Sequence, residues 1–190
     1  CWKKMIRSQT AKQEQQLESF LARHDAANPF PEDVLLTADA DYMGDGRPCH
    51  RMDIFRPREA KEALPVLVNI HGGGFLLGKK EANRLFCADM CRRGFVVFCL
   101  EYPLVPDVDI FTVFRALTAG IERAAALAPD FGGDASRLFL CGDSAGAYLC
   151  VYLAAMRKKR RHGACRRRAA AFPDIAALGL ISGMFYGAYF

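Results

Sequence analysis

The sequence predicts an α/β fold, a doubly wound and mostly parallel sheet that begins with an antiparallel hairpin. Short apolar runs bounded by turn residues recur from residue 66 onward, as in strands buried on both faces. Segments with helical periodicity separate these runs, and this alternation is typical of parallel sheets with helices on both faces. The 190 residues are 52% hydrophobic and 25% charged, which suits a globular domain with a sizeable core.

Residues 1–30 are predicted to form a cap-like helical segment, with the main domain in 31–190. An amphipathic helix is expected over 10–24, because Thr10 and Gln13 make a capping box at its start. Its apolar face would carry Leu17, Phe20 and Leu21. The prolines of 28–31 end this helix, which we expect to lie across the main body.

The main domain is expected to open with an antiparallel hairpin of strands 35–42 and 49–55. Asp45-Gly46 between them is a signal for a two-residue turn. Four buried strands are then expected at 66–70, 95–100, 138–141 and 176–181. The helices between them are expected at 81–93, 109–128 and 145–160. The middle helix is the clearest, with a stripe at the helical period formed by Ile110, Val113, Phe114, Leu117, Ile121 and Ala125.

Ligand sites in doubly wound sheets lie at the carboxyl ends of the strands, and Gly142-Asp143-Ser144-Ala145-Gly146 falls at such an end. A serine with a glycine two positions to either side suits a strained strand-to-helix turn that exposes the hydroxyl. Larger side chains at the glycine positions would collide with the neighbouring strand or helix. The alternative is an ordinary buried turn.

Two further features follow predicted strands. His71-Gly72-Gly73-Gly74-Phe75 comes directly after strand 66–70, and its glycines would let backbone N–H groups approach a developing oxyanion. The alternative there is a flexible loop. Glu101-Tyr102-Pro103 follows strand 95–100, and we expect a structural turn with a packed tyrosine.

Together these motifs resemble the hormone-sensitive-lipase group of α/β-hydrolases. The resemblance also includes Gly132-Gly133-Asp134 and Arg137, and it covers about residues 28–184. The group comprises intracellular carboxylesterases, lipases and deacetylases. Residues 102–107 read Y-P-L-V-P-D where the group usually has Y-R-L-A-P-E, a departure that affects local packing rather than the serine turn.

The resemblance implies a serine carboxylic-ester hydrolase that acts through an acyl-enzyme. Ser144 would be the nucleophile, and the N–H groups of Gly72 or Gly73, together with that of Ala145, would bind the oxyanion. His71 would orient the glycine loop and Asp143 would hold the turn. The remaining support would come from Gly74, Gly142 and Gly146.

The general base is the missing part of this prediction. The fold requires a carboxylate and then a histidine after the serine, whereas the chain offers only His162 and Asp174, in the reverse order. We therefore expect the sequence to be a piece of a longer esterase that stops near its sixth strand, inactive by itself. The alternative is a truncated relative that does not catalyse, or a ligand-binding module on the same fold.

Composition argues against other partners. The net charge of +5 is local, because 157–168 alone holds eight Lys or Arg residues, so we expect no nucleic-acid partner.

The apolar stretch 175–190 has glycines every four residues at Gly179, Gly183 and Gly187, a pattern also seen in membrane helices. It is shorter than the roughly 20 residues a span needs, so we expect a strand and loop there.

The eight cysteines form no C-x-x-C pair and lie mostly in apolar runs, which favours reduced thiols in a cytoplasmic protein. We expect neither a metal nor an organic cofactor, and a small-molecule ester as the partner.

Overall fold

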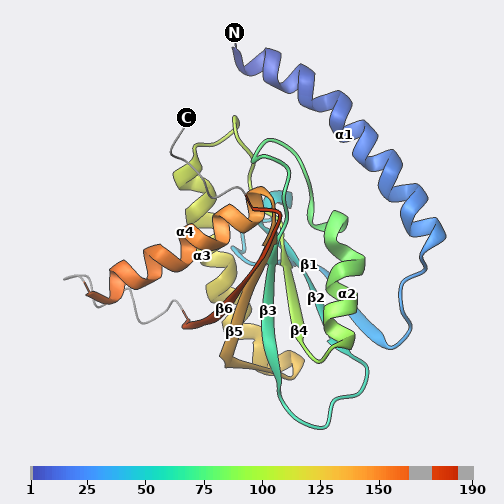
Figure 1. Cartoon of the computed structure of the whole chain (residues 1–190), viewed down its shortest axis with the longest axis vertical. Helices are drawn as coiled ribbons and strands as arrows, with labels where there is room; N and C mark the ends of the chain where they lie inside the picture. The colour runs from blue at the N-terminus through green and yellow to red at the C-terminus, as the bar shows by residue number, and fades with distance from the viewer. Residues whose placement is uncertain (1, 163–172, 184–190) are drawn as a thin grey trace.

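The computed structural model describes residues 2–162 and 173–183 and contains a six-stranded sheet in the order β1-β2-β4-β3-β5-β6 (Figure 1). The strands are β1 (Val34–Asp41), β2 (Arg51–Pro57), β3 (Leu64–Ile70), β4 (Val96–Leu100), β5 (Gly133–Asp143) and β6 (Ile175–Ile181). The helices are α1 (Trp2–Ala27), α2 (Arg84–Arg92), α3 (Ile110–Leu127) and α4 (Ala145–His162). Short 3₁₀ helices lie at Pro48–His50, Lys80–Asn83 and Ala128–Phe131.

The sheet is mixed in the predicted way. β1 pairs antiparallel with β2, and β2 pairs antiparallel with β4, whereas β4, β3, β5 and β6 are parallel. The carboxyl ends of β3, β4 and β5 therefore meet at one edge, and the three sequence motifs meet there.

The predicted two-residue turn at Asp45-Gly46 is wrong. β1 ends at Asp41 and β2 begins at Arg51, so a longer loop joins them. The Asp41 carboxylate accepts hydrogen bonds from the N–H groups of Met43, Gly44 and Gly46, at 2.7–2.9 Å. An Asx-type interaction at the strand end therefore organises the connection.

Helices cover both faces of the sheet, as predicted (Figure 1). On β3, Val66, Val68 and Ile70 point into a core shared with α3 and α4, whereas Leu67 points into a second core beneath α2. All five residues of β4 are buried. The prediction that every parallel strand is buried on both faces is wrong for β6, most of whose residues are exposed.

The α3 stripe is confirmed. Val113, Phe114, Leu117 and Ile121 are buried against the sheet, and Ile110 and Ala125 pack beside them. The carboxylate of Asp109 caps the helix by accepting the N–H of Thr112 at 2.7 Å.

Helix α1 is longer than predicted, and the capping box is wrong. Thr10 lies inside the helix, where its hydroxyl donates to the carbonyl of Arg7. On the expected apolar face Leu21 is buried, but Phe20 is 54% exposed. Arg7 pairs with Asp107, and Glu18 approaches Lys79, so α1 lies across loops at the carboxyl edge of the sheet. Its status as a separate cap-like segment stays a prediction.

No helix in the described ranges has the length and hydrophobicity needed to cross a membrane. Residues 175–181, for which a membrane helix was the alternative, form β6.

Candidate active site

Ser144 forms a strained turn between β5 and α4. It is the single residue between the two elements, and its φ of 49° lies in the left-handed region. Its side chain is exposed, and its N–H donates to the carbonyl of Ile181 at 2.8 Å. A Cβ added at Gly142 would lie 2.5 Å from the backbone of Gly146, and one at Gly146 would lie 2.0 Å from the carbonyl oxygen of Ile70. Only glycine fits at these positions, for the reason that the sequence predicted.

The glycine loop after β3 is hydrogen-bonded rather than unstructured. Gly73 and Gly74 have φ values of 118° and 61°, which glycine adopts without strain. The carbonyl of Gly73 accepts the N–H groups of Leu76 and Leu77, both at 3.1 Å. These hydrogen bonds give the loop a defined conformation.

Asp143 joins this loop to the serine turn. Its Oδ1 accepts the N–H of Gly72 at 3.1 Å and the side-chain amide of Asn83 at 2.9 Å. The N–H of Gly72 already donates to Asp143 and is not free to bind an oxyanion. Of the two glycines that the sequence suggested as oxyanion donors, Gly73 is therefore the one with an available N–H. Within the described part of the chain, the N–H groups of Gly73 and Ala145 have no hydrogen-bond acceptor.

His71 is buried, with 1% of its surface exposed, and is fixed on three sides. Its Nδ1 lies 2.7 Å from the carbonyl oxygen of Gly72, and its Nε2 lies 2.9 Å from Oε1 of Glu101. Its ring stacks on Tyr102, with the ring centroids 4.3 Å apart. His71 is thus held between the glycine loop, Glu101 and Tyr102.

The predicted structural turn with a packed tyrosine is also found. The Tyr102 hydroxyl donates to the carbonyl of His71 at 2.9 Å. Burial raises the pKa of Tyr102 well above its usual range, so the hydroxyl stays protonated. Sequence reasoning missed Glu101 as a site residue. The available signal was a carboxylate at the carboxyl end of a central strand, although its contact with a residue 30 positions away could not be read from the motif.

The backbone of His162 and the residue Asp174 both lie far from Ser144. His162 ends α4, about 26 Å along the helix axis from Ala145 at 1.5 Å per residue. Asp174 precedes β6 at the opposite end of the sheet and pairs with Arg157 at 2.8 Å. Of the histidines whose side chains the structure describes, His24 contacts Asp25, His50 contacts Asp45 and His71 contacts Glu101, and none of the three contacts Ser144.

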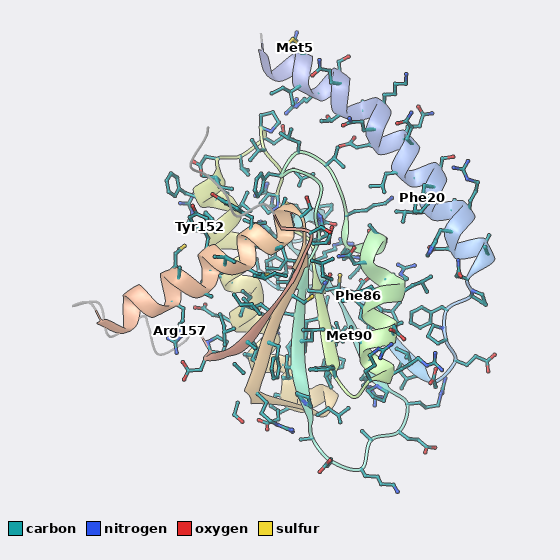
Figure 2. All side chains as sticks on the ribbon, viewed as in Figure 1. Met5, Phe20, Phe86, Met90, Tyr152 and Arg157 are labelled. Carbon is teal, nitrogen blue, oxygen red and sulfur yellow. The ribbon has the colours of Figure 1, made fainter. Side chains whose placement is uncertain are left out.

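An aromatic strip, formed by Phe75, Tyr148, Tyr152 and Phe114, extends from the glycine loop along α4. Ring centroids are separated by 5.8 Å between Phe75 and Tyr148, 4.5 Å between Tyr148 and Tyr152, and 5.9 Å between Tyr152 and Phe114. Figure 2 shows Tyr152 beside α3. The strip ends in a groove of about 430 Å³ lined by Phe111, Phe114, Arg115, Thr118, Ala119, Glu122, Tyr152 and Met156.

Two features bear on metals and thiols. Within residues 2–162 and 173–183, no group of three or more His, Cys, Asp or Glu side chains is placed to hold a metal ion. The cysteines in these ranges, Cys49, Cys87, Cys91, Cys99, Cys141 and Cys150, are free thiols.

The sequence of this chain is similar to the sequences of known esterases. The chain is 30% identical over 117 residues to a probable isoprenylcysteine alpha-carbonyl methylesterase of Oryza sativa subsp. japonica, covering 60% of this chain and 28% of that protein. It is 31% identical over 135 residues to the versiconal hemiacetal acetate esterase of Dothistroma septosporum, covering 70% of this chain and 39% of that protein.

Among solved structures, esterase B from Lactobacillus rhamnosis superposes with a TM-score of 0.79 at 23% identity, covering 94% of this chain and 57% of that one. This likeness shows the α/β-hydrolase fold. The chain thus spans between about a quarter and three fifths of the length of these proteins. The family model described as BD-FAE matches residues 52–174, which include the glycine loop and the serine turn, and the chain belongs to the BD-FAE family.

Proposed function

We propose that this chain supplies the nucleophile and the oxyanion site of a serine carboxylic-ester hydrolase that works through an acyl-enzyme. The observation that carries the proposal is the hydrogen bond from the Gly72 N–H to Asp143, because it links the glycine loop to a left-handed, exposed Ser144. Curated relatives of the chain are named esterases, which supports ester hydrolysis as the reaction class.

The expected chemistry follows from these positions. Ser144 Oγ attacks the ester carbonyl, and the N–H groups of Gly73 and Ala145 stabilise the negative charge that develops on its oxygen. Loss of one such donor typically raises the barrier by about 3–4 kcal/mol. The amino terminus of α4 adds the positive end of its dipole. Collapse of the tetrahedral intermediate breaks the bond to the alkoxide, which leaves as the alcohol with the proton that a general base took from the Ser144 hydroxyl. The acyl group stays on Ser144.

The reaction also needs a general base, because a serine hydroxyl without one is a weak nucleophile. None of His24, His50 and His71 contacts Ser144, and the backbone of His162 lies at the far end of α4. We therefore assign the activity to a protein that brings a histidine and a carboxylate to this serine. A protein of the 190 residues alone should show negligible turnover.

The aromatic strip from Phe75 to Tyr152 supports a substrate with an apolar acyl or alcohol group. Tyr148 lies one helical turn after Ser144, so an ester bound at the serine can extend over these rings. The aromatic strip offers the substrate mainly apolar contact area and few specific hydrogen bonds. It therefore suits a small-molecule ester better than a highly charged substrate.

The second candidate function is a non-catalytic binding module on the same fold. The observation that favours it is that none of His24, His50 and His71 contacts Ser144. Such a module would bind an ester or a similar apolar ligand without cleaving it.

Active-site labelling separates the two functions. The full-length protein is treated with a fluorophosphonate and assayed with a short-chain p-nitrophenyl ester. We expect labelling and hydrolysis that Ser144→Ala abolishes. The matched control Ser136→Ala removes a hydroxyl at the opposite end of β5 and should keep both. A folded full-length protein that is not labelled would exclude the esterase and favour the binding module.

A further inference from the structure

The buried ring of His71 lies between two hydrogen-bond acceptors. Its Nδ1 is 2.7 Å from the carbonyl oxygen of Gly72, and a carbonyl oxygen can only accept. Nδ1 therefore carries a proton. The ring is 1% exposed, so water does not replace either partner. Whether the second nitrogen, Nε2, carries a proton therefore depends on Glu101 alone.

Glu101 has the contacts of an ionised carboxylate. Its Oε2 accepts the backbone N–H of Lys80 at 3.0 Å, and its Oε1 accepts the backbone N–H of Tyr102 at 3.2 Å. Hydrogen bonds from two N–H groups favour the charged form of a carboxyl group. An ionised Glu101 can only accept, so Nε2 of His71, 2.9 Å from Oε1, must also carry a proton.

We propose that Glu101 holds His71 as an imidazolium cation, and that this fixed charge behind Gly72 and Gly73 helps to stabilise the oxyanion. Glu101 is then a positioning residue, which acts through His71 rather than on the substrate. The charge of His71 can be tested without any activity, whereas its effect on hydrolysis rests on the proposed function.

The surrounding charges suit a cation at this place. The Asp143 carboxylate, which accepts the N–H of the next residue, Gly72, is a second negative group in the site. Tyr102 stacks on the ring with an interplanar angle of 16°, and a tyrosine face attracts a cation. The ammonium group of Lys80 points away, to Asp39, Asp53 and Glu81 at 2.6–3.0 Å, so its charge is already balanced.

The loop leaves no room for another partner of the ring. A Cβ at Gly78 would lie 2.8 Å from Nδ1 of His71 and 2.5 Å from the carbonyl oxygen of Gly72. Gly78 has a φ of 107°, which glycine tolerates, and so the chain passes close over the imidazole. Among the described residues, the acceptors that contact the ring nitrogens are the carbonyl oxygen of Gly72 and Oε1 of Glu101.

Nitrogen NMR of the full-length protein with labelled histidine tests the charge. The two ring nitrogens have similar chemical shifts in an imidazolium and widely separated shifts in a neutral ring. At the pH of the hydrolysis assay, we expect the cationic pattern for His71, because both ring nitrogens face acceptors. His71→Gln identifies the signal by its loss. A neutral pattern for His71 at that pH would overturn the proposal without reference to any variant of Glu101.

Glu101→Gln tests the cause. A glutamine amide can donate to an unprotonated Nε2 while its oxygen accepts the Lys80 N–H, so both contacts can persist with a neutral ring. The substitution gives up the hydrogen bond that Oε1 accepts from the Tyr102 N–H. We expect the cationic pattern to disappear in this variant. If His71 stays cationic, Glu101 does not hold the charge and the proposal fails.

Hydrolysis by the same proteins tests the use of the charge. We expect Glu101→Gln to lower kcat about tenfold with little change in KM, because the lost charge acts on the transition state. The control Glu62→Gln makes the same substitution before β3, at the opposite end from His71, and should leave both constants unchanged. Loss of the cation with an unchanged kcat would overturn the catalytic half of the proposal. Wild-type protein without hydrolysis would instead refute the proposed function, and the spectrum would still decide the charge.

Discussion

The carboxylate of Asp143 accepts the backbone N–H of Gly72 at 3.1 Å and so links two motifs that lie 71 residues apart. The same oxygen takes the amide of Asn83, which also contacts Asn69 at the end of β3. The serine turn, the glycine loop and the start of α2 thus share one acceptor atom.

We expect Asp143→Ala to lower kcat about tenfold in the full-length protein, because it removes the acceptor that positions the glycine loop. The free energy of unfolding should fall by about 1–3 kcal/mol, the cost of unsatisfied buried donors. Ester hydrolysis and urea unfolding measure the two effects. Asp143→Asn keeps an oxygen at the Oδ1 position and should recover most of both losses. If Asn and Ala are equally damaging, the charge of Asp143 matters rather than its acceptor.

Gly146→Ala should destabilise the protein by about 3 kcal/mol or more, because its Cβ would lie 2.0 Å from the backbone oxygen of Ile70 and the clash requires backbone movement. Denaturant unfolding measures this loss. Gly120→Ala is the matched control, since it is also a helical glycine facing the sheet. Its Cβ would meet the end of the Leu100 side chain at 2.8 Å, which can move. The control should cost far less, and equal losses would contradict the packing described at the serine turn.

Lys80→Met should destabilise the protein by about 3–5 kcal/mol, since it leaves the buried Asp53 carboxylate without its nearest cation. Burial disfavours the charged form of Lys80, but the hydrogen bonds to Asp53, Glu81 and Asp39 outweigh it and raise the pKa of Lys80. Urea unfolding is the measurement. The double variant Lys80→Met/Asp53→Asn should recover at least half of the loss. No recovery would show that the loss does not come from the stranded carboxylate.

Asp134 should make stability depend on pH in the acid range. Hydrogen bonds from Ser136 and Arg137 lower the pKa of Asp134 from its usual 3.8 to about 2. The folded state thus favours the ionised form, so the stabilisation is present above about pH 4 and is lost as the pH falls to about 2. In thermal unfolding, Asp134→Asn should be less stable than wild type above pH 4, and the difference should shrink toward pH 2. A difference that stays constant over this range would contradict the assignment.

Local patterns were enough for much of the fold. The stripe from Val113 to Ile121 predicted α3, because one helix face must be apolar to pack on a sheet. The strand–helix alternation predicted the parallel order, since parallel neighbours need a crossover connection. The glycines around Ser144 predicted the strained turn, because the collisions they avoid lie within the motif or with the adjacent strand.

The two predictions that rested on only two residues each, the tight turn and the capping box, were wrong. Asp45-Gly46 suggested a tight turn, but the carboxylate of Asp41 organises a longer loop. Thr10 and Gln13 suggested a helix start, but the helix continues through them from Trp2. In both cases the local pattern suits more than one structure, and interactions outside the pattern choose between them.

The sequence by itself therefore determined the fold class, the serine turn and the glycine loop, because each depends on residues that are near neighbours in the chain. Only the tertiary structure decided that Asp143 takes the Gly72 N–H, that Glu101 contacts His71, and that α4 carries His162 away from Ser144. These relationships depend on how strands distant in sequence align at one edge of the sheet. Sheet pairing and register set that alignment, and no single stretch of the sequence encodes it.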